Sequence, residues 1–540
     1  MTRLARAAAA IGHAANVLFG TPSNRHGSPA AFPDRGEVAV SDGPMVIAYH
    51  PSARQAGEGV LAAGGNACDA FVAAVVAENV VAEGASSLAG SLSALVHVAA
   101  EGRTLYLDGG FNDPVDRAAA WSPGRGTGRA VLVPGAPAAL AALHGRFGRL
   151  PWARLLEPGI ALAEEGFAPT RLMSAVAALR TRELRRSDYG RATYRPDDGL
   201  PPRMHLPHVA AFLRRLAEDG PDHVYRGAWG KAFLRTVAAA GGRLTARDLS
   251  VYEARWDEPH VGDFRGCRVE SSSGRSYGGL WVQLALATLD RSGIDDAGSI
   301  AQRMAIARGT WREPRLFDPA VLDDRSASRW RAADGAPAVI EGLVDGEGRA
   351  AAAAHSYPII VRDGDGTIVN GTTTAQSEPW GDGLFVQGVS LTASGRIAFG
   401  VAPGERRLSP FSQHLVHGDD GPRLVVGTIS NSAVEAAFQL LATLVGTDAD
   451  LGAAVALPRF GTFPPKRRSL RPKPDLSRMW LDPRVGREER DAIAARRLRV
   501  SQRDPVDTGL GAVMRIGPGR IEGATLPLPY LDDPFAEEAS

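Results

Sequence analysis

The chain contains a serine and a run of threonines placed where they could do acyl-transfer chemistry. Tyr357–Val361 is rich in β-branched and aromatic residues and predicts a strand, and Asp363–Gly366 carries two Asp-Gly pairs typical of a tight turn. The return strand ends in Thr372–Thr374, so the hairpin is predicted to bring Ser356 beside threonine hydroxyls. A cut immediately before Ser356 would add a free α-amine, and the two groups would be the base and nucleophile of an N-terminal nucleophile. The alternative is a structural serine at the start of a strand.

The composition excludes several classes of protein. The chain has 540 residues, 44% of them hydrophobic and 22% charged, as in soluble globular proteins. A net charge of +1 provides no field for nucleic acid or an anionic membrane, and the basic stretch 466–474 lacks interleaved aromatic residues. Cys68 and Cys267 form no zinc pattern, and the histidines lack metal-ligand spacing. We therefore expect no metal site and no nucleic-acid partner.

The first residues resemble neither a membrane anchor nor a well-designed export signal. Residues 1–37 begin with a basic segment, but His13 and Asn16 interrupt the apolar run that follows. No stretch of the chain approaches 18 uninterrupted apolar residues, so no membrane span is predicted. We expect residues 1–37 to be a poorly ordered leader on a cytoplasmic protein, with export as the alternative.

Helices and strands are predicted in blocks, without regular alternation. Residues 66–83 are apolar on nearly every side and predict a buried helix, and further helices are expected over 136–147 and 430–445. Strands are expected over 38–49 and 91–99, in the hairpin, and in pieces near 384–402 and 512–525. Because the strands do not alternate with helices in βαβ units, the pattern favours a layered α+β protein over a doubly wound sheet.

Several motifs in this order resemble the γ-glutamyltransferase (glutathione hydrolase) family of N-terminal-nucleophile hydrolases. The similarity extends from about residue 38 to about residue 526. The segments that carry it are GGNACDA at 64–70, VPGAPAALAALHGRFGRLPWARLLEPGIALAEEGF at 133–167, RLTARDLSVYEARWDEPHVGDFRGCRV at 243–269, SYGG at 276–279, RLSP at 407–410, VGT at 426–428 and PRF at 458–460.

The resemblance implies a four-layer αββα sandwich that cleaves itself into two chains and needs no cofactor. Residues 38–355 would form the large-subunit-like region and residues 356–540 the small-subunit-like region, intertwined in one domain. The implied partners are a small-molecule substrate and the two chains of one precursor, without membrane or nucleic acid.

The family's nucleophile is a threonine that follows the cleaved bond, and two registers place it differently here. Aligning on the downstream Asp-Gly and Thr-Thr-Thr places Ser356 at that position without a gap. Aligning on the histidine of the family motif places Ala353 there and removes the nucleophile. We prefer Ser356, and in that register Thr374 matches the second-strand threonine that supports the nucleophile.

The positions that bind a γ-glutamyl group in the family carry other residues here. Gly110 stands where the family has the arginine that binds the substrate carboxylate, and Gln376 where it has an asparagine. Ser394–Phe399 (SGRIAF) replaces the acidic pair that holds the substrate amine, and Ser409, followed by proline, replaces a serine pair. Ser430–Asn431 replaces the oxyanion-hole glycines. Since each charge-assisted contact contributes about 1.5–3 kcal/mol, γ-glutamyl affinity should be lost.

We therefore expect an autocleaving hydrolase of this family with a substrate other than γ-glutamyl compounds. The reaction would be amide or acyl hydrolysis, or hydrolytic C–C cleavage in a secondary-metabolite pathway. One alternative is an unprocessed, inactive family member that serves as a binding or scaffold protein. A second alternative is a true glutathione hydrolase.

Overall fold

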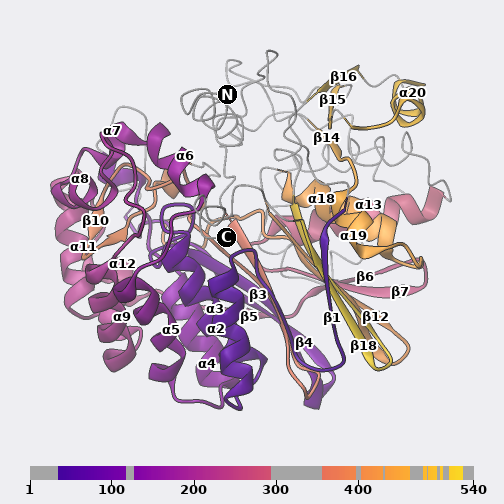
Figure 1. The fold of residues 1–540 in the computed structure, drawn as a ribbon, viewed down its shortest axis with the longest axis horizontal. Helices are drawn as coiled ribbons and strands as arrows, with labels where there is room; N and C mark the ends of the chain where they lie inside the picture. The colour runs from indigo at the N-terminus through magenta and orange to yellow at the C-terminus, as the bar shows by residue number, and fades with distance from the viewer. Residues whose placement is uncertain are drawn as a thin grey trace.

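The computed structural model describes residues 35–116, 127–292, 356–396, 403–429, 432–462, 478–482, 484–495, 499–502 and 510–526. Two large antiparallel sheets lie at its centre (Figure 1). The seven-stranded sheet has the order β1 (Glu37–Ser41), β18 (Arg520–Thr525), β17 (Leu510–Gly517), β13 (Gly421–Ile429), β12 (Gln413–Gly418), β7 (Cys267–Ser271) and β6 (His260–Phe264). The six-stranded sheet has the order β2 (Met45–Ile47), β8 (Ser356–Arg362), β9 (Ile368–Thr374), β3 (Ser91–Val98), β4 (Arg103–Gly109) and β5 (Arg255–Asp257).

The two sheets pack face to face through apolar side chains. Ile360 and Ile368 from the six-stranded sheet meet Leu415, Val425 and Met514 from the seven-stranded sheet in one buried cluster. Because side chains alternate along a strand, Ile360 shares this inter-sheet face with Ser356 at the start of β8. The sheet packing therefore decides which way the hairpin's polar residues point.

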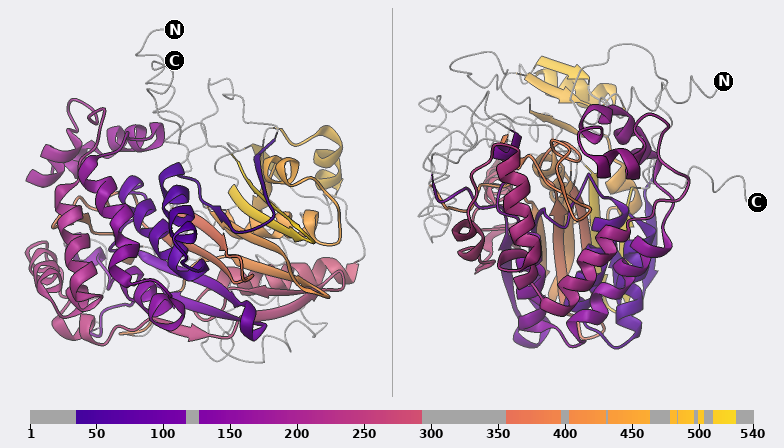
Figure 2. Two further views of the ribbon diagram at one scale, coloured as in Figure 1. Left: turned by 60° about the horizontal axis from the view of Figure 1, so that its bottom comes forward. Right: turned by 90° about the vertical axis from the view of Figure 1, so that its left-hand side faces the viewer.

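Helices pack against the outer face of each sheet (Figure 2). Helices over the six-stranded sheet and in the layers beyond it are α2 (Pro51–Ala62), α3 (Ala67–Val81), α4 (Ala136–Phe147), α5 (Trp152–Glu165), α6 (Arg171–Leu179), α7 (Thr181–Leu184), α8 (Asp188–Tyr194), α9 (Pro207–Asp219), α10 (Asp222–Tyr225), α11 (Ala228–Ala239) and α12 (Ala246–Ser250). Helices against the seven-stranded sheet are α13 (Tyr277–Ser292), α18 (Ala433–Leu444) and α19 (Leu451–Ala456). The α+β class is confirmed.

Smaller elements complete the described structure. The 3-10 helices are η1 (Ala99–Glu101), η3 (Thr127–Ala130) and η5 (Ser394–Arg396), and α20 (Arg487–Ala495) is a further α-helix. Strands β10 (Phe385–Val386) and β11 (Val389–Ser390) form a short hairpin, and β14 (Phe460–Thr462), β15 (Arg478–Leu481) and β16 (Arg499–Gln502) form a separate sheet.

Helix α3 is buried on every side, as its composition predicts, since all of its residues are inaccessible. Asn66 caps it by accepting hydrogen bonds from the N–H groups of Cys68 and Asp69. The Asp69 carboxylate in turn accepts from the N–H groups of Asn66, Arg149 and Leu150. Residues 66–69 therefore join α3 to the loop between α4 and α5, and we refer to them as the Asn66–Asp69 corner.

Two predicted strands differ in the structure. Residues 38–49 form two strands in different sheets, because the chain turns at Asp42–Pro44 and β2 pairs with β8 while β1 pairs with β18. The piece near 384–393 contains only β10 and β11, joined by a turn that includes the positive φ of Gln387 and Gly388. Residues 397–402 of the same prediction lie outside the described residues, as do residues 1–34 of the predicted leader.

Candidate active site

The hairpin places Ser356 and Thr374 directly opposite each other. The two residues are register partners in β8 and β9, and Ser356 Oγ donates a hydrogen bond to Thr374 Oγ1 at 2.9 Å. Ser356 is partly exposed, whereas Thr374 is 1% exposed. The juxtaposition predicted from the two Asp-Gly pairs is therefore present: one accessible hydroxyl hydrogen-bonds to one buried hydroxyl at the end of a strand.

Gln376 lies immediately beyond this pair, in a strained conformation. Its backbone N–H donates to Thr374 Oγ1 at 3.0 Å, so the same oxygen accepts from both Ser356 and Gln376. Its φ of 44° lies in the left-handed region, which costs a residue other than glycine about 1–2 kcal/mol. Its side-chain Nε2 is buried and makes no hydrogen bond within the described structure. Gln376 thus contacts the hydroxyl pair through its backbone, while its side-chain amide nitrogen has no partner among the described residues.

Ser409 belongs to a buried chain of hydroxyls. Ser409 Oγ lies 3.1 Å from Ser276 Oγ, which lies 2.7 Å from the Tyr106 hydroxyl. Ser276 and Ser409 also form an isolated β-bridge, so this part of the loop is tied to the start of α13. Burial raises the pKa of the Tyr106 hydroxyl, which therefore stays protonated. We find Ser409 engaged with other hydroxyls of the protein, and its predicted role in substrate binding stays a prediction.

Gly110 lies against an arginine that comes from a distant part of the chain. A Cβ atom at Gly110 would lie 3.1 Å from Arg406 Cδ and 3.0 Å from Asp108 Oδ1. The Gly110 N–H donates to Asp108 Oδ1, and its carbonyl accepts from the Tyr252 hydroxyl. Gly110 therefore has little room for a side chain of its own, and its match to the family's arginine stays a prediction.

The guanidinium of Arg406 is fully buried and occupied by protein acceptors. It donates from Nε to Asn112 Oδ1 at 2.8 Å, from NH1 to the carbonyl and carboxylate of Asp108 at 2.6 and 2.9 Å, and from NH2 to the Glu253 carbonyl. Burial works against its charge, but Asp108 and the Tyr252 hydroxyl outweigh burial and raise the pKa of Arg406. Arg406 is therefore a structural cation whose donors already have partners.

Other predicted site positions lie outside the described residues. These are Ser430 and Asn431, the alternative nucleophile position Ala353, and residues 397–399 of the SGRIAF segment. The described part of that segment forms η5, where Ser394 Oγ donates to the Ala375 carbonyl at 2.7 Å and Arg396 pairs with Asp382. The roles expected of Ser430 and Asn431 remain predictions.

Two buried acids near the hairpin were not anticipated from the sequence. Glu83 accepts hydrogen bonds from the Tyr194 hydroxyl, Trp380 Nε1 and the Ser390 N–H. Glu78, one turn earlier, is 0% exposed, and neither of its oxygens is hydrogen-bonded in the part of the chain that the structure describes. Burial raises the pKa of Glu78 to about 8, and the nearby His50 N–H offsets only part of this shift. The sequence signal available was an acid inside an otherwise apolar helix.

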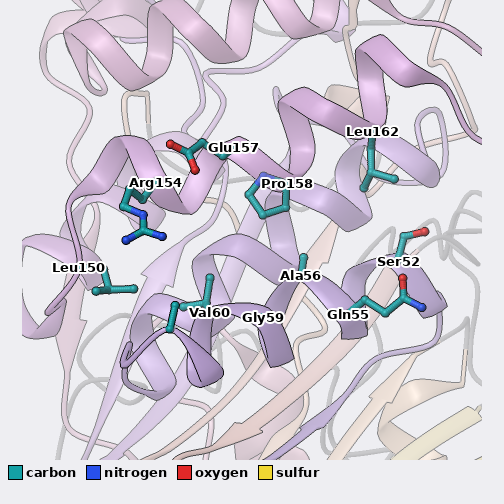
Figure 3. Close-up of a pocket in the computed structure, with 11 residues that line it drawn as sticks. Ser52, Gln55, Ala56, Gly59, Val60, Leu150, Arg154, Glu157, Pro158 and Leu162 are labelled. Atoms are coloured by element: carbon teal, nitrogen blue, oxygen red, sulfur yellow. The ribbon is translucent and has the colours of Figure 1, made fainter.

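A surface groove lies apart from these residues. It has a volume of about 350 Å³ and runs between α2 and α5, lined at one end by Ser52 and Gln55 and at the other by Leu150 and Arg154 (Figure 3). No predicted site residue lines it. Among the described residues, no cluster of histidine, cysteine, aspartate and glutamate could hold a metal ion, and no helix is long and apolar enough to cross a membrane.

The comparisons with known proteins agree on one family. The family model described as gamma-glutamyltranspeptidase matches residues 53–308. The acylase ACY 1 proenzyme of a Pseudomonas strain is 27% identical over 92% of this chain and 94% of its own. The glutathione hydrolase proenzyme of Pseudomonas aeruginosa is 27% identical over 80% of this chain and 85% of its own.

A solved structure has the same fold over nearly its whole length. The cephalosporin acylase from Bacillus halodurans matches with a TM-score of 0.75 and 24% identity, covering 95% of this chain and 98% of that chain. The family model and the two full-length relatives show that the chain is similar in sequence to gamma-glutamyltranspeptidases and acylases. Both of these relatives are named as proenzymes, one of an acylase and one of a glutathione hydrolase.

Proposed function

We propose that this protein is a self-processing acylase-type hydrolase that cleaves amides other than γ-glutamyl amides, with Ser356 as the nucleophile. The observation that carries the proposal is the hydrogen bond from Ser356 Oγ to Thr374 Oγ1 at the end of β8. The names of the relatives support it, since an acylase proenzyme matches over nearly the whole chain. The architecture that we assign is the four-layer αββα sandwich of N-terminal-nucleophile hydrolases.

Self-processing would use the hydroxyl that later performs catalysis. Ser356 Oγ attacks the carbonyl carbon of residue 355, the bond to the Ser356 nitrogen breaks, and an ester forms. Water then hydrolyses the ester, which leaves a carboxylate on residue 355 and a free α-amine on Ser356. Thr374 Oγ1 accepts a hydrogen bond from the Ser356 hydroxyl and so orients it. After cleavage, the α-amine of Ser356 becomes the base for later acyl transfer. The products would be a large region ending at residue 355 and a small region of residues 356–540.

The substrate side of the proposal depends on the surroundings of Gly110. A γ-glutamyl substrate carries a carboxylate and an amine that need charged partners. At Gly110 the nearby cation is Arg406, whose donors are occupied by Asp108, Asn112 and Glu253. Losing such charge-assisted contacts lowers affinity by several powers of ten. The site therefore suits a less polar acyl group.

Processing is tested on a denaturing gel. Purified full-length chain should convert into two fragments whose smaller member begins at Ser356 by N-terminal sequencing. Ser356→Ala should remain a single 56.8 kDa chain, whereas Ser356→Thr should still cleave. A single band for the wild-type chain after long incubation would overturn the self-processing proposal, and a fragment beginning at residue 353 would move the cleavage site.

Substrate class is tested on the processed protein with paired chromogenic amides. We expect hydrolysis of simple N-acyl p-nitroanilides and no measurable turnover of γ-glutamyl-p-nitroanilide. Turnover of the γ-glutamyl compound at ordinary rates would instead support a true glutathione hydrolase. If neither amide is cleaved, the next substrates to assay are small acids with a C–C bond that can be cleaved by hydrolysis. That reaction would use the same nucleophile and base.

A second candidate is an unprocessed family member that binds a partner or ligand without catalysis. Its support is the replacement of the family's oxyanion-hole glycines by Ser430–Asn431, since a changed loop would weaken stabilisation of the tetrahedral intermediate. The gel separates the two candidates, because an inactive member stays as one chain. Cytoplasmic location, with export as the alternative, is likewise our proposal and is tested by cell fractionation.

A further inference from the structure

The segment that follows the hairpin is held in an unusual backbone conformation. Of the five described residues other than glycine with positive φ, three lie within residues 376–387: Gln376 at 44°, Trp380 at 53° and Gln387 at 48°. Such conformations persist only where the surroundings fix them, because side chains disfavour the left-handed region. The surroundings of this segment therefore indicate what it is built to position.

Glu83 is the principal anchor of this segment. Its carboxylate accepts Trp380 Nε1 at 2.6 Å, the Ser390 N–H at 3.1 Å and the Tyr194 hydroxyl. Glu83 is 4% exposed and Trp380 is 1% exposed. The Trp380 ring also lies against Gly84, where an added Cβ would lie 2.4 Å from a ring atom. A single buried carboxylate thus accepts hydrogen bonds from Trp380, inside the strained segment, and from Ser390, just after it.

The segment's first residue touches the nucleophile pair. The Gln376 N–H donates to Thr374 Oγ1 at 3.0 Å, and that oxygen also accepts Ser356 Oγ at 2.9 Å. A shift of Gln376 would therefore change the orientation of the Thr374 hydroxyl. Glu83 lies before the proposed cleavage site, whereas Trp380 and Ser390 lie after it, so this contact also joins the two prospective chains.

We propose that Glu83 is a positioning residue for the nucleophile: by anchoring Trp380 and Ser390 it fixes Gln376, and through Gln376 it sets the hydroxyl pair Thr374 and Ser356. The inference rests on the proposed function of Ser356. A carboxylate suits this role because it only accepts hydrogen bonds, and all three of its partners are donors. An amide of the same shape would direct its own N–H groups at one of these donors and displace the segment.

The test compares Glu83→Gln with Asp248→Asn, a matched substitution of another buried carboxylate. Asp248 is also buried and also accepts three hydrogen bonds, from the Val115 N–H and from the N–H and hydroxyl of Thr245, but it does not touch residues 376–390. Each full-length variant is purified as precursor, its folded fraction is measured by circular dichroism, and the half-time of self-cleavage is measured on a denaturing gel. We expect Glu83→Gln to slow cleavage of folded protein at least tenfold, and Asp248→Asn to change it less than twofold.

A second pair of variants covers the case in which Glu83→Gln does not fold. Trp380→Phe removes the donor on the strained segment, and Tyr194→Phe removes a donor to the same carboxylate from α8. We expect a several-fold slowing for Trp380→Phe and less than twofold for Tyr194→Phe. The inference would be overturned if the wild-type chain cleaves and Glu83→Gln cleaves at the same rate. It would also be overturned if the two variants of a pair, Glu83→Gln and Asp248→Asn or Trp380→Phe and Tyr194→Phe, slow cleavage equally. Absence of cleavage in the wild-type chain would overturn the proposed function itself.

Discussion

The Asn66–Asp69 corner and Gly110 both align with motifs of the family. The family residues are retained at the corner, whereas glycine replaces an arginine at position 110 in the predicted alignment. At the corner, the Asn66 and Asp69 side chains accept hydrogen bonds from five backbone N–H groups, three within residues 66–69 and two in the loop between α4 and α5. Around Gly110, the expected arginine is absent and Arg406 fills the space with bonds to Asp108. In the predicted alignment, family residues are thus kept at the corner, where they hold backbone segments together, and replaced at Gly110, where we predict that a substrate binds.

The difference has a physical reason. A buried carboxylate that satisfies several N–H groups cannot be exchanged without leaving those donors unpaired, which makes the corner intolerant of change. A residue that binds only the substrate has no structural partner when the substrate changes, so it is free to be replaced. The comparison can be tested by substitutions in both regions.

The largest expected effect is on stability at the corner. Asp69→Ala should lower the free energy of unfolding by about 3–5 kcal/mol, because it leaves the N–H groups of Asn66, Arg149 and Leu150 buried without partners. Denaturant unfolding measures the loss. The control is Asp365→Asn in the exposed ion pair with Arg149, which should cost less than about 1 kcal/mol. Equal losses in the two variants would contradict the structural role of Asp69.

A pH-dependent gain in stability is expected when Glu78, the buried acid of α3, is replaced. Burial raises the pKa of Glu78 to about 8, so the folded state holds a proton that the unfolded state releases near its ordinary value of 4.5. The folded state therefore loses stability as pH rises from about 4.5 to about 8. Glu78→Gln removes this titration and should be more stable than wild type by about 4 kcal/mol at pH 8, with little difference at pH 5. Parallel stability curves for the two proteins would refute the prediction.

A smaller effect is expected on the hydroxyl pair. Thr374→Val keeps the shape of the side chain but removes the acceptor of Ser356 Oγ and of the Gln376 N–H, so self-cleavage should slow about tenfold, or about 1.4 kcal/mol in activation free energy. Thr372→Val is the matched control, because the buried hydroxyl of Thr372 makes no hydrogen bond within the described structure. Both rates come from time courses on denaturing gels. If Thr372→Val is as slow as Thr374→Val, the hydrogen bond is not what matters.

The smallest effect is expected where the family residue is restored. Gly110→Arg should produce no measurable turnover of γ-glutamyl-p-nitroanilide, because the new side chain would begin 3.1 Å from Arg406 Cδ and the partner acids of the substrate amine are still absent. Gly110→Ala serves as the steric control. Both variants should be less stable than the wild-type protein, because a Cβ atom at this position crowds Arg406 and Asp108. A gain of γ-glutamyl hydrolysis in Gly110→Arg would show that this one residue had decided specificity.

Much of the architecture could be predicted because it depends on local patterns. The buried helix α3 follows from an apolar run with a capping box, and the hairpin follows from β-branched residues around Asp-Gly pairs. The division of residues 38–49 between two sheets could not be predicted, because strand pairing is decided by partners far along the chain. The same limit applies to the candidate site. Arg406 lies 298 positions from Asp108, and no local pattern marks that pairing.

The sequence by itself predicted the chemistry at Ser356 and the binding residues that are replaced around it, because these predictions depend only on residue type and order. Tertiary structure decided how the remaining residues are used. It placed Thr374 as the acceptor of Ser356 and assigned the donors of Arg406 to protein acceptors. It also gave Glu83 three donors, whereas neither oxygen of Glu78 is hydrogen-bonded among the described residues. These outcomes depend on which side chains meet in the packed interior, where an unpaired polar group is costly and a single contact can set the role of a residue.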